Sequence, residues 1–446
     1  MTRIAKALWL ALATASLILI GTGCNDTLRQ FITPVPGPAG DPGTLSHAVV
    51  LSTNPAVPTD GSPALGSTLH IDVSGDTVAG VVNVGPSPVF LGKAPSRVFV
   101  LNSGDNTASA YLALLPLSSV VSTITLPSGT SAQAGGFSNS GNFFVTSPSG
   151  NVDVITAAVL AFTKALPVGA NPVAIAGNSS NSKIYVVNQG SDNVTVISTI
   201  DNFVFPQAIS LADPAGHAGQ AANPIWGVMA PDGVHVFVVN QGDGTHTGWV
   251  SVIDTFLDQV IANVPVGLSP NYAVFEPHLQ RVYVSNTGDS TVSVIKANGI
   301  DLANQIVPTN IANIPVPSGL TSVAALADGS RVYAAIGGCP AGTSHINLLS
   351  NLASCTGNQV AVIDATSFGV KKVLTVGAGA VSIDAANDSS RVYVVGANAG
   401  NISIIRTSDD NVLTTVAAPQ QSLGCQSKVV CPGTGTQTPF MVRVFP

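Results

Sequence analysis

Six side chains that could bind a ligand or take part in catalysis lie in, or just after, three irregular stretches, residues 212–224, 241–248 and 337–358. An indole ring beside a polar surface can stack on a sugar or hold an apolar residue of a partner. The alternative for the tryptophans is packing between repeats. The histidine spacing gives no ligand pair, so no metal site is predicted. The candidate binding residues are His217, Trp226, Asp243, His246, Trp249 and His345.

Three asparagines form a second group of candidates because they recur at one position of a repeated pattern. Asn188, Asn240 and Asn286 each follow a run of aliphatic or small residues. They could ring one opening of the fold as polar binding groups. They could also cap the turn that follows, through side-chain hydrogen bonds to the backbone. The sequence alone leaves both roles open.

Motifs for catalysis and for cofactors are absent from the sequence. The chain contains no GxSxG elbow, HExxH helix, P-loop or EF-hand loop, and no CxxC or CxxCH motif. Glu276 is the single glutamate, which leaves no glutamate pair for glycoside hydrolysis. We therefore predict no catalytic residue and no cofactor, and keep an enzyme as the alternative.

The composition of the 446 residues favours strands over helices. The chain has 44 Gly, 30 Pro and many Val, Thr and Ser residues, which suit strands and tight turns. A hydrophobic fraction of 45% argues against disorder. The chain has 16 basic residues, no basic cluster and a net charge of −7, so nucleic acid is not an expected partner.

A repeated strand pattern supplies the elements that must position the candidate residues. Apolar residues alternate with small or polar ones, β-branched residues predominate, and an Asn/Asp/Gly turn follows. Second, third and fourth strand patterns complete each repeat. The repeats start 41 to 60 residues apart, and four antiparallel strands in such a period indicate a propeller blade. The repeated strands begin at His47, Arg97, Asn142, Lys183, His235, Arg281, Arg331 and Arg391.

Two of these repeats resemble the YVTN family of β-propellers nearly end to end. They are residues 183–198 (KIYVVNQGSDNVTVIS) and 281–296 (RVYVSNTGDSTVSVIK). The family, which is YncE-like or of surface-layer type, occurs in bacterial periplasmic and surface proteins and in archaeal surface layers. The resemblance covers residues 47–446 and implies an all-β propeller. It implies no particular activity, because family members share a scaffold and not one function.

We predict eight four-stranded antiparallel blades, with seven, the commoner number in such propellers, as the alternative. The first repeat begins with a second strand, residues 47–52, and has no inner strand before it. The chain ends on an orphan strand of inner type, residues 439–446. Pairing that strand with the first repeat would complete one blade and close the ring. A degenerate first repeat with a loose tail would leave seven.

The long connections are predicted to lie on one face of the ring. If the strands of a blade are labelled A to D from the axis outward, B–C turns and D–A crossovers share a face. The long connections found there are 53–66, 212–224, 241–248, 337–358 and 418–438. Loops on a rigid scaffold are where binding surfaces are usually built, so this long-looped face is the expected binding face.

The first residues read as an export signal. Residues 1–23 contain Arg3 and Lys6 followed by an apolar run, and Cys24 comes next. The pattern resembles a bacterial lipoprotein signal in which Cys24 would carry the lipid; plain secretion or a retained anchor are the alternatives. Residues 24–46 would then be the lipidated cysteine and a Pro/Gly-rich tether, and 47–446 the propeller domain.

The remaining four cysteines are even in number, as expected of a disulfide-permissive compartment. Three pairings are possible, and the pairs that are close in sequence are the predicted ones. These are Cys339 with Cys355 and Cys425 with Cys431.

These features favour a non-catalytic binding or scaffolding module anchored in the cell envelope, periplasmic or at the cell surface. It would be a monomeric propeller that docks a protein, peptide or polysaccharide through the long-looped face. A propeller hydrolase or lactonase is the first alternative, and a structural protein of a surface coat is the second.

Overall fold

The computed structural model describes residues 46–54, 64–94, 97–112, 121–212, 219–422 and 434–445. The expected signal sequence and residues 24–45 of the expected tether therefore lie outside the described residues. The same holds for four candidate residues, Cys24, His217, Cys425 and Cys431. No helix among the described residues is long and apolar enough to cross a membrane.

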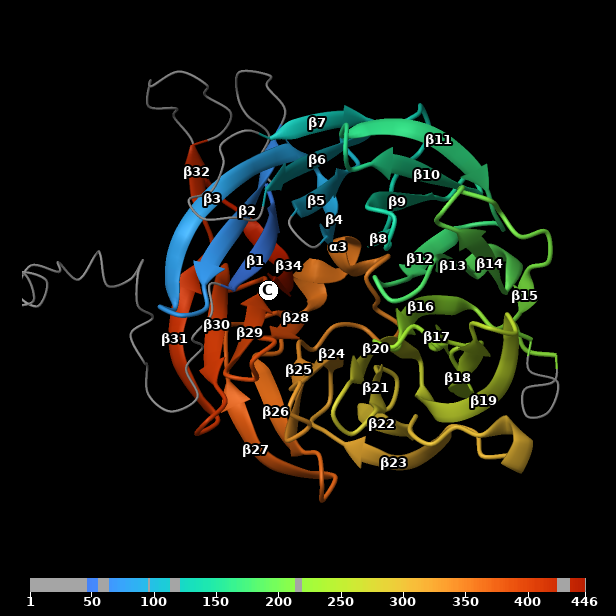
Figure 1. Ribbon diagram of the computed structural model, residues 1–446. Helices are drawn as coiled ribbons and strands as arrows, with labels where there is room; N and C mark the ends of the chain where they lie inside the picture. The colour runs from blue at the N-terminus through green and yellow to red at the C-terminus, as the bar shows by residue number, and fades with distance from the viewer. Residues whose placement is uncertain are drawn as a thin grey trace, which may run out of the picture.

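Eight four-stranded antiparallel sheets are arranged as the blades of an eight-bladed β-propeller, as predicted (Figure 1). The innermost A strands are β34 (Thr438–Phe445), β4 (Pro88–Lys93), β8 (Gly135–Phe137), β12 (Pro172–Ala176), β16 (Pro224–Met229), β20 (Pro270–Glu276), β24 (Leu320–Ala325) and β28 (Ala380–Ala385). The B strands are β1 (His47–Thr53), β5 (Arg97–Asn102), β9 (Asn142–Ser147), β13 (Lys183–Asn188), β17 (His235–Asn240), β21 (Arg281–Asn286), β25 (Arg331–Ile336) and β29 (Arg391–Gly396).

The two outer strands of each blade follow in the same order. The C strands are β2 (Leu65–Asp72), β6 (Thr107–Leu112), β10 (Asn151–Thr156), β14 (Asn193–Ser198), β18 (Thr247–Asp254), β22 (Thr291–Lys296), β26 (Gln359–Asp364) and β30 (Asn401–Arg406). The D strands are β3 (Thr77–Pro86), β7 (Ser122–Thr125), β11 (Ala161–Pro167), β15 (Ile209–Ser210), β19 (Gln259–Leu268), β23 (Thr309–Pro315), β27 (Gly369–Thr375) and β31 (Asn411–Ala417). Short elements complete the described chain: η1 (Gln189–Ser191), η2 (Leu302–Asn304), α3 (Leu348–Asn351), η3 (Leu352–Ser354), and the hairpin of β32 (Gln420–Ser422) and β33 (Thr434–Thr436).

The two ends of the described chain close the ring together. Strand β34 pairs antiparallel with β1, from His47 opposite Phe445 to Thr53 opposite Thr438. The sheet order β3-β2-β1-β34 makes this mixed blade (blade 1) complete, and the blades starting at β4 to β28 are blades 2 to 8. The prediction of eight blades closed by the C-terminal strand is therefore confirmed.

Neighbouring blades pack through their B and C strands, which are covered on both faces and form the core. In β13, for example, Ile184 to Val187 have no exposed surface. Such strands read as continuous apolar runs because each side chain, whichever way it points, meets an adjacent blade. The outer D strands are exposed on alternate residues, as in β31.

Polar bonds also join neighbouring blades at the C–D turns. At three of these turns an aspartate adopts a left-handed φ of 51° or 52°, which Asp tolerates better than most residues. Its carboxylate then reaches the B strand of the preceding blade. The three contacts are Tyr185 Oη to Asp258 Oδ1 (2.6 Å), Tyr333 Oη to Asp410 Oδ1 (2.6 Å) and Arg391 Nη2 to Asp76 Oδ2 (2.9 Å).

Long connections occur on both faces of the ring, whereas the sequence predicted them on one face. The antiparallel order places B–C and D–A connections on one face, and 241–246 and 337–358 lie there. However, the C–D connections 199–208 and 297–308 are also long, and they lie on the opposite face. The prediction did not include them; β15, which follows the first, has only two residues and leaves little pattern in the sequence. The argument for one binding face therefore needs support from the site itself.

Candidate functional site

A single B–C connection, residues 337–358, enters the centre of the ring; we call it the plug. It leaves β25, forms α3 and η3, and returns to β26. Figure 1 shows α3 near the centre, with the blades around it. Leu348 and Leu352 bury their side chains in the core cluster that includes Val381 of β28 and Phe440 of β34. The plug is therefore packed against the channel wall.

The base of the plug is held by a disulfide and by close backbone contacts. Cys339 and Cys355 are bonded, so the predicted pairing of these two is confirmed. Gly338 has a φ of 65°, and a Cβ there would come within 2.8 Å of the Gly357 nitrogen. Only glycine suits such a position. The disulfide and the close approach of Gly338 to Gly357 hold the two ends of the plug together.

His345 fixes the tip of the plug to the opposite wall of the channel. Its Nε2 lies 2.9 Å from the carbonyl oxygen of Val173 in β12, which makes Nε2 the protonated, donating nitrogen. The imidazole also meets the indole of Trp226 edge to face, with 5.0 Å between centroids. Burial is the main cause that lowers the pKa of His345 to about 4; the bond to Val173 opposes this shift and the charge of Arg443 adds to it. The imidazole is therefore neutral at physiological pH.

Asn271 of β20 is a second anchor of the plug, and it was not among the predicted residues. Its Nδ2 donates to the carbonyl oxygens of Thr321 (2.7 Å) and of Thr343 in the plug (3.0 Å). Its Oδ1 accepts from Ser285 Oγ at 2.6 Å. A lone asparagine on an inner strand carries no motif, so no sequence pattern could have identified this role.

The plug and the channel wall line a small cavity of about 50 Å³. Its lining includes Ser344 and His345 from the plug, Tyr272 and Ser322 from the wall, and Arg443 from β34. Trp226 extends the same aromatic wall, since its ring centroid is 4.8 Å from that of Tyr272 and its Nε1 donates to the Ala273 carbonyl oxygen.

Connection 241–248 lies beside the plug on the same face. A Cβ on Gly342 of the plug would lie 3.8 Å from Gln241 Nε2, so the two segments are neighbours. Asp243 and His246 are both exposed, with Oδ2 and Nδ1 2.7 Å apart. The backbone N–H and the imidazole of His246 hold the pKa of Asp243 well below its usual range. This pair therefore presents a carboxylate and an imidazole to solvent.

The remaining predicted binding residues are buried in the described structure. Trp249, Asn188, Asn240 and Asn286 have no exposed surface, which places them inside the blades and away from any opening. The side-chain amides of the three asparagines donate hydrogen bonds to hydroxyl groups of the adjacent C strand. They do not cap the backbone of the following turn, which was the alternative prediction. These bonds run from Asn188 Nδ2 to Thr195 Oγ1, from Asn240 Nδ2 to Ser251 Oγ and from Asn286 Nδ2 to Ser293 Oγ, each 2.8 or 2.9 Å.

Two of the six loop-region candidates, Trp226 and His345, thus come into direct contact, and Asp243 and His246 form a separate exposed pair. No group of three or more His, Cys, Asp or Glu side chains that could hold a metal ion occurs within the described part of the chain.

Comparisons with known proteins show the fold but no family. No family profile matches the chain, and no curated protein matches it. Among solved structures, the dihydro-heme d1 dehydrogenase NirN in complex with DHE is similar at 13% identity, with a TM-score of 0.62 over 92% of this chain and 78% of that chain. A Kuenenia stuttgartiensis hydrazine synthase chain is similar at 16% identity, with a TM-score of 0.52 over 72% of this chain and 96% of that chain. At such identities the likeness concerns the propeller fold alone.

Proposed function

We propose that this protein is a binding or scaffolding module of the cell envelope, whose long-looped face docks a protein, peptide or polysaccharide. The observation that carries the proposal is the plug. It lies near the ring centre and adjoins connection 241–248, so that these two segments would form one surface over the channel. A broad surface of this kind suits an extended partner better than a small molecule entering a deep channel.

The exposed groups of this surface are small and mostly polar. The plug exposes Asn347, Ser350 and Ser354, and the neighbouring connection exposes Asp243 and His246. Amide and hydroxyl groups of this kind both donate and accept hydrogen bonds, as sugar hydroxyls and peptide groups require. The disulfide and the packed leucines hold the plug in place, which lowers the entropic cost of binding.

The cellular setting of the proposal comes from the sequence. The YVTN-like repeats and the lipoprotein-like signal support an exported protein, lipid-anchored at Cys24, with residues 24–46 as a tether between membrane and propeller. The surface would then face partners in the periplasm or outside the cell.

Cross-linking of the native protein in its own envelope, followed by mass spectrometry, tests the proposed function. A variant with Asp243→Ala and His246→Ala is compared with Asp232→Ala, which removes a carboxylate from the A–B turn of the same blade on the opposite face. We expect the wild type and Asp232→Ala to capture the same partner and the double variant to lose it. Equal capture by all three would argue against docking through connection 241–248.

A hydrolase is the second candidate, favoured by the pairing of Asp243 with His246. A carboxylate bonded to Nδ1 leaves Nε2 as the possible base, which is how an orienting carboxylate serves an imidazole in hydrolases. A screen of lactone and ester substrates tests this candidate. Turnover that disappears in His246→Ala would favour the enzyme over the binding module.

A further inference from the structure

Arg443 places a positive charge in the channel without a matching carboxylate. From β34 in blade 1 its guanidinium reaches toward β20 in blade 6, where Cζ lies 5.9 Å from the ring centroid of Tyr272. Its Nη1 donates to the Val442 carbonyl oxygen at 3.1 Å. Within the described ranges, no carboxylate lies within ion-pair distance of Arg443.

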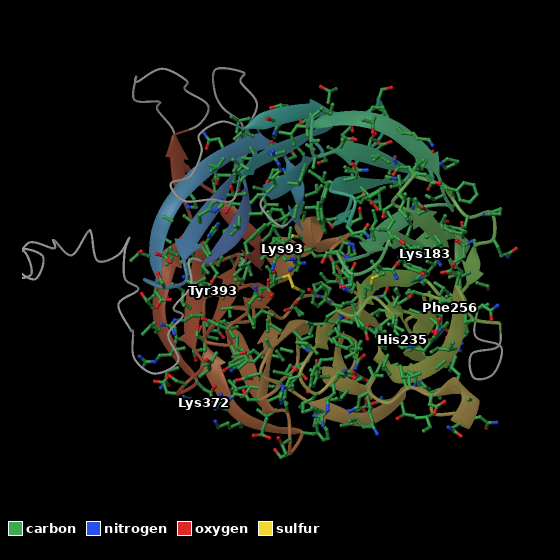
Figure 2. The ribbon with its side chains drawn as sticks, viewed as in Figure 1. Lys93, Lys183, His235, Phe256, Lys372 and Tyr393 are labelled. Carbon is green, nitrogen blue, oxygen red and sulfur yellow. A yellow bond between two sulfur atoms is a disulfide. The ribbon has the colours of Figure 1, made fainter. Side chains whose placement is uncertain are left out.

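The nearby charged groups are already engaged with backbone. Asp384 Oδ2 accepts from the Val444 N–H at 2.9 Å, and its Oδ1 accepts from the Ala385 N–H. Lys93, labelled near the centre of the ring in Figure 2, donates to the Val444 carbonyl oxygen at 2.7 Å. The guanidinium of Arg443 thus keeps donors available for a ligand.

The cavity beside Arg443 also contains polar atoms without a hydrogen-bond partner. Ser344 Oγ and His345 Nδ1 are both buried and unpartnered, and both residues line the cavity. Leaving a buried polar group without a partner is unfavourable, so such atoms point to an absent occupant. The volume of about 50 Å³ has room for about three water-sized groups.

We propose that this cavity is a binding site for a small oxyanion the size of a simple carboxylate, separate from the docking surface. Arg443 would bind the anion through its planar fork of N–H donors. The Ser344 hydroxyl of the plug, which has no hydrogen-bond partner in the structure, would donate a second hydrogen bond to the anion. Binding here would join the plug to β34, and so link the channel cover to the closing blade.

His345 gives the site a characteristic pH dependence. Nε2 carries the proton that bonds Val173, so Nδ1 must take up a second proton before it can donate to an anion. The groups that face this imidazole from the packed strands are Arg443 of β34, Tyr272 of β20 and Trp226 of β16. The anion would supply the negative charge that they lack, so binding should strengthen as the pH falls from 7 to 5.

Calorimetric titration of the full-length protein with sodium formate, at constant ionic strength set with sodium chloride, tests the proposal. We expect saturable one-to-one binding that tightens toward pH 5. Arg443→Gln should weaken it roughly ten-fold or more, the loss of one charge-assisted contact. Arg406→Gln, which changes an exposed arginine at a C–D turn, should leave it unchanged.

Three results would overturn the proposal: no saturable formate binding by the wild type, equal binding by Arg443→Gln, or binding that is independent of pH. If Arg443→Gln does not fold, Ser344→Ala provides the second test, because Ser344 Oγ bonds nothing in the structure. It should weaken formate binding while leaving the thermal unfolding midpoint without formate unchanged.

Discussion

At the scale of single residues, the propeller depends on a few buried polar groups whose partners come from distant repeats. Arg391 is 1% exposed, and its guanidinium donates to both carboxylate oxygens of Asp76, which is 315 residues away in sequence. The pair joins blade 8 to blade 1, the blade that closes the ring. Arg391 could be recognised in the sequence as the start of a repeated strand, but its partner could not, because Asp76 sits in the least regular repeat.

The first prediction concerns this ion pair. Arg391→Met should lower the free energy of unfolding by about 3–5 kcal/mol, because it removes the buried guanidinium that pairs with the partly buried Asp76 carboxylate. Arg406→Met, which breaks the exposed pair of Arg406 with Asp409, should cost less than about 1 kcal/mol. Urea unfolding of both variants measures the difference. Similar losses in the two would show that the buried pair has no special role.

Buried histidines predict how stability depends on pH. Burial, and the neighbouring His47, lower the pKa of His70 to about 3 from an ordinary 6.5, and burial lowers that of His345 to about 4. Between these lowered pKa values and about pH 6.5, the unfolded chain binds more protons than the folded one. Stability therefore falls as the pH drops below about 6.5. At pH 4 the contribution of His70 alone is a loss of about 3 kcal/mol.

His70→Gln should therefore flatten the stability profile between pH 7 and pH 4, measured by urea unfolding at each pH. His278→Gln, at an exposed histidine in the A–B turn of blade 6, is the control and should leave the profile of the wild type unchanged. A profile for His70→Gln that is as steep as that of the wild type would contradict this origin of acid sensitivity.

At the scale of elements, the plug shows where prediction from the sequence ends. The pairing of Cys339 with Cys355 could be predicted, because two cysteines near each other in the sequence have few alternatives. The position of the segment between them could not. It depends on Leu348 and Leu352 meeting Val381 and Phe440, contacts that exist only once the ring has closed. For the same reason the position of His345 could not be predicted. It was a candidate binding residue of the long-looped face, but it lies against the channel wall.

The disulfide should stabilise the whole fold as well as the plug. It closes a loop of 16 residues in sequence separation, for which loop entropy predicts about 3 kcal/mol. Replacing both Cys339 and Cys355 by serine should therefore lower the unfolding free energy by up to this amount. It should also loosen the plug and increase the quenching of Trp226 fluorescence by acrylamide.

Trp226→Phe in the serine background identifies the source of the added quenching. The completely buried Trp249 should then be the tryptophan of the described residues that still emits, and it should stay protected. If quenching is the same with and without the disulfide, the packed leucines alone hold the plug.

At the scale of the whole molecule, the number of repeats determines the architecture. The period and alternation of the strands predicted the blades because each repeat buries its core strands against two neighbours. The orphan strand 439–446 predicted closure, since only blade 1 lacked an inner strand. The long C–D connections 199–208 and 297–308 were not predicted, so the choice of a binding face depends on the plug and its neighbour, not on loop length.

The central claim is that a partner docks on the face formed by the plug and connection 241–248. Incorporation of a photo-cross-linking amino acid in place of Ser350 in the plug, or of Phe256, tests it directly in the native envelope. Phe256 is 90% exposed in the C–D turn of blade 5, on the opposite face, and Figure 2 shows it toward the outer edge of the ring. The proposal predicts adducts with a discrete partner from position 350 and none from position 256. Adducts from position 256 alone, or from neither position, would contradict it.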